Sequence, residues 1–326
     1  MADLFEKLAT LGLSASYVRR AGLPSWWDDE LNDIPAGVLE GAMHIAQRLH
    51  VNLVSLLKDD LEAQFEPLLP TKFKYHHQQA ADVPLIAHQV ASGIAELVAY
   101  STRQHPFIPL PKTAVQVRRG VLEQGTKVDL ESLLHYCWHH GVAVVYFNDY
   151  PQDARKLTGM IQWQEGRPVI LLSSARTQSA WLAFHLAHEL GHLVLGHVQE
   201  GILVDDEISQ SSEDVEEMAA NEFAVKLLVN RLDNCFSESC FRNSNQLRKQ
   251  ILKKVEADPT VDSCVLAFNY SWHSKNFGLA NKAVEKLDCA EGGNQVIGQF
   301  LEKRVDWEDL NSDSIYHLDY ILGADV

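Results

Sequence analysis

The chain has 326 residues, of which 46% are hydrophobic and 22% charged, a composition typical of a folded protein of about two domains. The formal net charge of −16 argues against a protein that works mainly by neutralising nucleic-acid phosphates or by lying on an anionic membrane. The sequence holds no apolar run of about 18 residues and no signal-peptide pattern at its N-terminus. We therefore expect a cytoplasmic protein without a membrane-spanning helix.

Residues 1–65 are predicted to form a module of short helices. One helix is expected over 11–20 and a clearer one over 36–57, with a loop between them at 23–28. Residues 45–57 resemble the end of a degenerate XRE-type helix-turn-helix domain. Residues 1–60 hold five Lys and Arg against nine Asp and Glu, whereas a DNA reader is basic on its docking face. We therefore expect a protein-docking module, with a DNA-binding regulator acting through residues 1–65 as the alternative.

The rest of the chain is predicted to contain a linker, a core and an extension. Residues 66–110 form a proline-rich linker, which includes His76 and His77, and a helix over 85–100. Residues 111–232 form an α+β core, and 233–326 a mostly helical extension. The elements expected in the core are helices over 115–123, 129–141, 178–197 and 211–230, and strands over 141–147, 159–163 and 168–172, the last two as a hairpin.

The five cysteines are predicted to be separate thiols. Their number is odd, and no Cys-x-x-Cys pair occurs, which argues against a disulfide framework or a cysteine-based zinc site. The expected state is buried, reduced thiols. The cysteines are Cys137, Cys235, Cys240, Cys264 and Cys289.

The strongest motif is His188–Glu189–Leu190–Gly191–His192, an HExxH pattern within the helix predicted over 178–197. Residues four apart lie on one face of a helix, so both imidazoles can reach a single metal ion. Glu189 lies about 100° around the helix from His188, where its carboxylate can act as a general base. The alternative is a helix with ordinary core or surface histidines. The metal site is favoured by the preceding hairpin, whose edge strand could bind an extended peptide, and by the acidic helix that follows.

That following helix supplies the candidates for a third ligand. A hydrolytic zinc site uses three protein ligands and keeps one position open for water. We favour Glu217, because Asn221 lies one turn further along the same face and could orient Glu217 or bind the free nitrogen of a ligating histidine. Glu213 is the second choice, since it lies one turn earlier. The other carboxylates considered on this helix are Glu216 and Glu222.

Residues 115–229 resemble the ImmA/IrrE metallopeptidases. The matching pieces, in order, are VRRGVLEQGTKVDLESLLHYCWHHGVAVVYF, GMIQWQEGRPVILLSSARTQSAWLAFHLAHELGHLVLGH and EEMAANEFAVKLLV. The family often has a glutamate two residues before the asparagine and a Met-Pro pair after the Leu-Leu, where this chain has Ala219, Val229 and Asn230. The exact end of the helix is therefore open.

The resemblance implies a site and a role. It implies that His188, His192 and Glu217 are zinc (Zn2+) ligands, that Glu189 is the catalytic base, and that Asn221 lies on the supporting helix. It also implies an α+β, zincin-like fold, in which a small antiparallel sheet packs on the HExxH helix between helical N- and C-terminal parts. Proteins of this family typically cleave regulatory proteins such as helix-turn-helix repressors or antitoxins. We therefore expect a zinc-dependent metallopeptidase with such a protein substrate; a zinc-binding regulator that does not cleave is the alternative.

Overall fold

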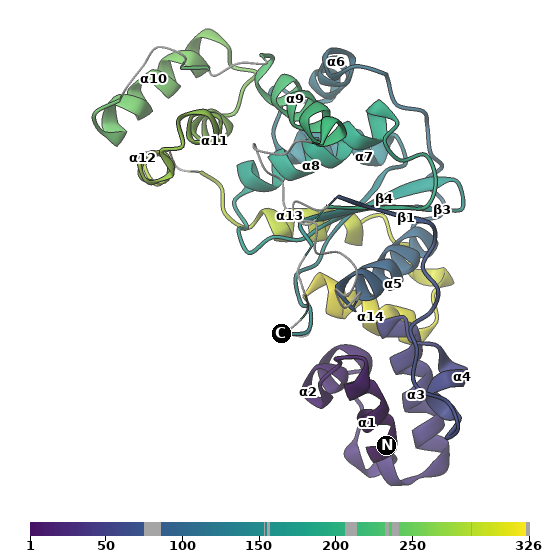
Figure 1. The fold of residues 1–326 in the computed structure, drawn as a ribbon. Helices are drawn as coiled ribbons and strands as arrows, with labels where there is room; N and C mark the ends of the chain where they lie inside the picture. Colours follow the sequence, from purple (N-terminus) through teal and green to yellow (C-terminus); the bar gives the residue numbers. More distant parts are fainter. Residues whose placement is uncertain are drawn as a thin grey trace.

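A five-stranded mixed sheet forms the centre of the structure, a computed structural model (Figure 1). The structure describes residues 1–74, 86–152, 154, 157–205, 214–231, 235–236, 241–287 and 289–323. The strands are β1 (Thr71–Lys74), β2 (Ala143–Tyr146), β3 (Gly159–Gln164), β4 (Arg167–Leu172) and β5 (Ile202–Asp205), in the order β1-β5-β3-β4-β2. The fold class is α+β, as predicted.

The predicted hairpin is confirmed, but it lies in the interior of the sheet. β3 pairs antiparallel with β4 on one side and with β5 on the other, while β4 also pairs with β2. The turn between β3 and β4 places Glu165 and Gly166 at φ 49° and 82°, as in the tight turns that match strand twist. The edge strands β1 and β2 run parallel to their neighbours, so the sheet is antiparallel only at its centre. The hairpin therefore has no free edge for a peptide, and that part of the prediction is wrong.

Helices cover both faces of the sheet. The element α8 (Ser179–Leu195) packs on β3 and β4 from one side, together with α6 (Ala114–Gln124), α7 (Leu130–His139) and α9 (Val215–Val229). On the other side lie α5 (Ile86–Ser101) and α14 (Ser312–Leu322), and Figure 1 shows the sheet between these two layers. All six residues of β4 are buried, as expected for a strand that is covered on both faces.

The ends of the core helices follow the predicted signals. Asp129 caps α7 through a reciprocal capping box with Ser132, and Gly141 follows the helix at φ 69°. The residue after α9 is Asn230 in the left-handed conformation, φ 56°, which fixes the helix end left open by the sequence. The predicted start at Ser211 lies outside the described residues, and Asp214 is the N-cap.

The N-terminal helices are shorter than predicted. They are α1 (Ala2–Thr10), α2 (Ala15–Tyr17), α3 (Pro35–Leu49) and α4 (Leu53–Leu57). The single helix expected over 36–57 is interrupted because His50 adopts a left-handed conformation and Val51 pairs with Phe65 in a β-bridge. The helix expected over 11–20 is wrong in its first half, where Gly12, at φ 81°, turns the chain after α1.

The three arginines of this N-terminal module face carboxylates of the same chain. Arg48 is buried and pairs with Asp313 of α14 at 2.7 Å. Arg20 pairs with Asp149 at 2.8 Å, and Arg19 pairs with Asp29. These ion pairs reduce the positive charge that the three arginines could offer to phosphates.

The C-terminal part is helical, as predicted, and returns to the core. Its elements are α10 (Ser244–Ala257), α11 (Ser263–Ser274), α12 (Phe277–Val284), α13 (Gly293–Glu302) and α14. α13 packs against β2 and α8, and α14 packs against α5. None of the helices described combines the length and apolarity needed to cross a bilayer.

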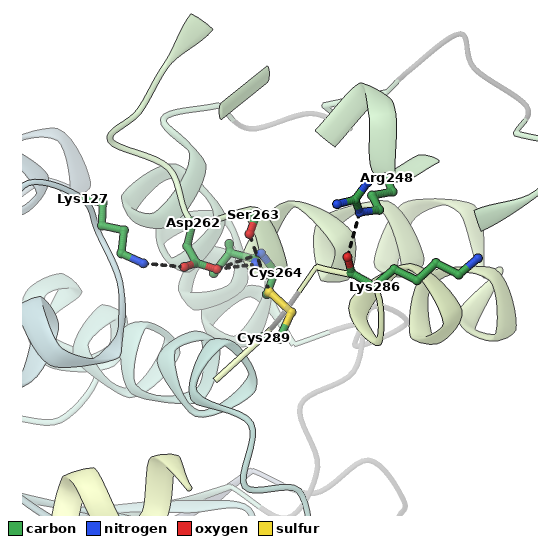
Figure 2. The surroundings of a disulfide bond; sticks show 8 residues. Lys127, Arg248, Asp262, Ser263, Cys264, Lys286 and Cys289 are labelled. Carbon is green, nitrogen blue, oxygen red and sulfur yellow. Dashed lines mark hydrogen bonds and ion pairs between the residues drawn. A yellow bond between two sulfur atoms is a disulfide. The ribbon is translucent and has the colours of Figure 1, made fainter. Parts of the chain in front are cut away.

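A disulfide joins Cys264, in the first turn of α11, to Cys289, beyond the end of α12 (Figure 2). The expectation of five separate thiols is therefore wrong for this pair, because the fold brings residues 25 positions apart to a Cα–Cα distance of 5.9 Å. Beside it, Asp262 accepts hydrogen bonds from the backbone N–H groups of Cys264 and Val265, and Lys127 of the core binds the same carboxylate at 3.0 Å. Cys137 and Cys235 are buried thiols, and Cys240 lies outside the described residues.

We expect the Cys264→Ser substitution to lower the free energy of unfolding by about 3–4 kcal/mol, because a loop of this length is no longer closed in the unfolded chain. Denaturant titration with and without a reductant measures the effect. The reductant should destabilise the wild type by the same amount and leave the variant unchanged. Equal responses of the two proteins to the reductant would contradict this prediction.

Candidate metal centre

The helix α8 brings the two histidines of the motif together. The Nε2 atoms of His188 and His192 lie 3.1 Å apart, and both side chains are fully buried. They lie one turn apart on the face of α8 that meets α9. The helix ends at Gly196, which adopts φ 76°, and the turn brings His197 back against His192.

The helix α9 contributes Glu217 to the same point. Its Oε2 lies 3.4 Å from His188 Nε2, and its Oε1 lies 3.3 Å from His192 Nε2. The two helices approach closely because small residues meet there: a Cβ on Gly191 would lie 3.3 Å from the Cα of Ala220. Glu217 is thus in the position predicted for the third ligand.

The other carboxylates considered on α9 lie elsewhere. Glu216 binds Lys72 and Lys74 of β1, the latter at 2.7 Å, and Glu222 is exposed. Glu213 lies outside the described residues.

A fourth side chain, Asp205, was not predicted. It is the last residue of β5, and its Oδ2 lies 3.3 Å from His188 Nε2 and 3.5 Å from His192 Nε2. One ligand atom from each of His188, His192, Asp205 and Glu217 lies within 4.8 Å of all the others. The sequence signal for Asp205 was weak: an acidic residue that ends a short apolar run after the motif.

The far nitrogens of both histidines have partners. His188 Nδ1 lies 3.1 Å from the Oδ1 of Asn221, and His192 Nδ1 lies 2.8 Å from the Nδ1 of His197. An N–H donated from each Nδ1 leaves the Nε2 lone pairs directed toward the common point. Asn221 is therefore placed to orient His188. His197 likewise contacts His192, and burial followed by the charge of His192 lowers the pKa of His197 to about 4.

His185 is outside the cluster. Its ring packs on Trp181 with the centroids 5.1 Å apart, and burial lowers its pKa to about 3. A neutral imidazole in an aromatic environment is a core residue.

Glu189 lies beside the cluster. It is fully buried, and neither of its carboxylate oxygens has a hydrogen-bond partner among the described residues. Its carboxyl group packs against the backbone of β3, where a Cβ on Gly159 would lie 2.6 Å from Glu189 Cδ. Burial, and next the charge of Asp205, raise the pKa of Glu189 well above its usual value. A carboxylate with a raised pKa is a better proton acceptor than an exposed one.

The donor atoms fit a divalent metal ion. Both oxygens of Asp205 and one of Glu217 are buried without a hydrogen bond among the described residues; the two imidazoles are close to them, and a divalent ion would satisfy all these donor atoms together. The distances that join the two Nε2 atoms to each other and to Asp205 Oδ2 span 3.1–3.5 Å, and Glu217 turns a different oxygen toward each histidine. A tetrahedral ion with bonds of about 2.0–2.1 Å requires about 3.3–3.4 Å. Two neutral imidazoles with two carboxylates also balance a charge of +2.

Without an ion, the cluster can bind a proton at His188 instead. Burial lowers the pKa of His188, but Asp205 and Glu217 outweigh this effect and raise the pKa to about 10. Burial likewise raises the pKa of Glu217, and the two histidines outweigh it and hold this pKa well below its usual value. Metal and protons therefore compete for the same atoms.

The fold and the cluster define an α+β domain that can hold a metal ion between two helices and a strand end. Residues 137–233 match the family model Peptidase_M78, described as the IrrE N-terminal-like domain, which supports the resemblance to the ImmA/IrrE family. The family suggests a metallopeptidase-like function. The comparison with curated proteins gave no match.

Proposed function

We propose that the protein is an intracellular zinc-dependent metallopeptidase with a zincin-like core. The observation that carries the proposal is the convergence of His188, His192 and Glu217 within 3.1–3.4 Å of one another, in a segment that matches a peptidase family. These three residues would hold the zinc ion, Asn221 would orient His188, and Glu189 would be the base. The packing of α8 on β3 and β4 supports the zincin-like description.

Peptide hydrolysis would depend on the bound ion and on Glu189. A bound zinc ion would supply Lewis-acid activation of the scissile carbonyl and of a water molecule. The carboxylate of Glu189 would accept a proton from the attacking water and then deliver it to the leaving nitrogen. Since Glu189 is buried against the backbone at Gly159, its carboxylate is held beside the cluster and shielded from bulk solvent.

The substrate we propose is a protein, and the family resemblance supports a regulatory one, such as a helix-turn-helix repressor or an antitoxin. An extended segment of such a protein cannot pair with the hairpin, because both of its edges are already paired. The sheet edge nearest to the cluster is β1, which pairs with β5. A peptide bound along this side of the sheet would add to β1.

Metal content tests the site. Elemental analysis of the purified protein should find one zinc per chain in the wild type and none in His188→Ala. The matched control is His139→Ala, an exposed histidine of α7, which should retain one zinc per chain. A His188→Ala variant that is folded by circular dichroism and still binds one zinc would contradict the proposal.

A zinc-binding regulator that does not cleave is the second candidate function. The observation that favours it is Asp205, which gives the cluster four protein ligands, the number typical of structural zinc sites. Substitution of Glu189 separates the two candidates, since only a peptidase depends on this carboxylate.

A further inference from the structure

The carboxylate of Asp205 occupies a full ligand position of the cluster. Its Oδ2 lies at 3.3 and 3.5 Å from the two Nε2 atoms, close to the separations that Glu217 shows at 3.4 and 3.3 Å. By distance, Asp205 is as much a ligand as Glu217. With it, the chain would supply four ligands to a bound ion, the number that fills a tetrahedral site.

The strand ladder holds Asp205 in this position. Its backbone carbonyl accepts a hydrogen bond from the N–H of Thr158 at 2.7 Å, and its register partner on β3 is Gly159. The side chain is 1% exposed, and neither oxygen has a hydrogen-bond partner among the described residues. A buried carboxylate is unfavourable unless it is paired, so its contacts with the two imidazoles stabilise this position.

Asp205 also lies where a hydrolytic site needs space for a water molecule. Its ladder partner Gly159 is the residue against which the Glu189 carboxyl group packs. The water activated by a general base has to lie between that base and the metal, in the one position not filled by protein. In this structure a carboxylate of the chain lies on the Glu189 side of the cluster.

We propose that Asp205 is a fourth, inhibitory ligand, which takes the position required by the hydrolytic water and keeps the peptidase inactive in this conformation. The inference rests on the proposed function. Activation requires the Asp205 side chain to leave the cluster while His188, His192 and Glu217 remain. Because Asp205 is the last residue of β5, its release disturbs only the final rung of the ladder.

Cobalt substitution of the full chain tests the ligand position directly. The visible absorption of tetrahedral Co²⁺ responds when an added ligand binds the metal, and acetohydroxamate serves as the probe. We expect acetohydroxamate to leave the spectrum of the wild type unchanged and to shift that of Asp205→Ala in a saturable manner. The affinity of Asp205→Ala for zinc, measured by competition with a chromophoric chelator, should fall by about 10–100-fold.

Hydrolysis of fluorescently labelled casein provides the second measurement. If the competent state is populated to a tenth or less, the rate of Asp205→Ala should exceed that of the wild type by about tenfold or more. Glu222→Ala is the matched control, since it removes an exposed carboxylate of α9 that is not part of the cluster. Asp205→Asn keeps the size of the side chain and replaces the alanine variant if that one does not fold.

The outcomes distinguish the two proposals. A wild-type cobalt protein that binds acetohydroxamate as tightly as Asp205→Ala does would overturn the inhibitory role and leave the peptidase proposal intact. Loss of casein cleavage in Asp205→Ala, with metal still bound, would also overturn it, since Asp205 would then support catalysis. A wild type that binds no metal at all would instead overturn the proposed function.

Discussion

The Glu189→Gln substitution should reduce the rate of peptide hydrolysis by about 10²–10⁴-fold, the range expected when a general base is removed. The amide has the size of the carboxylate but cannot accept a proton. Glu189 lies beside the cluster, whose ligand atoms come from His188, His192, Asp205 and Glu217. We therefore expect Glu189→Gln to retain one zinc per chain.

Casein cleavage measures the loss of rate, and elemental analysis of the same preparation measures the zinc content. The effect of Glu189→Gln should be measured both in the wild type and in the Asp205→Ala variant, where the proposed inhibition is removed. Glu222→Gln, an exposed glutamate of α9, is the control and should leave the rate unchanged. A Glu189→Gln variant that cleaves at the wild-type rate would assign the base to another residue, and the role proposed for Glu189 in hydrolysis would be wrong.

The Gly159→Ala substitution should lower the rate by about 10²-fold or more through one added methyl group. A Cβ at this position would lie 2.6 Å from Glu189 Cδ, closer than real contacts allow, and 3.2 Å from its Cγ, which is a tight contact. Glu189 is fully buried, so its carboxyl group has to move away from its present position. A displacement of about 1 Å at a reacting group costs about this much in rate.

The expected signature of Gly159→Ala is a loss of rate with unchanged zinc content, accompanied by a loss of about 1–3 kcal/mol in the free energy of unfolding from overpacking. Casein cleavage, elemental analysis and denaturant titration measure the three quantities. Gly278→Ala is the matched control, because a Cβ there would meet no atom within 4 Å. Full activity in Gly159→Ala would show that the position of the Glu189 carboxylate is not critical.

The parts of the cluster carried by helices could be predicted from the sequence. Helical spacing of four residues places His188 and His192 on one face, whatever the rest of the fold does. Glu217 and Asn221 have the same spacing on the next helix, and small residues where the two helices meet allow the pair to approach. Local periodicity therefore sufficed to indicate that these four side chains come together.

The parts that depend on contacts distant in sequence were missed. Asp205 reaches the cluster only because β5 inserts between β3 and β1, and strand order is not encoded in local periodicity. The interior position of the hairpin was missed for the same reason. The strands β5 and β1 extend the sheet beyond β3, and β1 lies in a segment that was predicted to be a linker. The pairing of Cys264 with Cys289 depends in the same way on how α11 and α12 pack, which cysteine spacing alone does not determine.

The edge strand β1 has a consequence for how the domain that holds the cluster can be isolated. Lys74 is buried and binds both Asp214, the N-cap of α9, and Glu216, at 2.7 Å each. These two contacts anchor the helix end that presents Glu217, yet Lys74 lies 63 positions before residue 137, where the family segment begins. A recombinant fragment limited to residues 137–233 would lose this anchor and uncover the backbone edge of β5, so the shortest autonomous unit has to extend upstream to include β1.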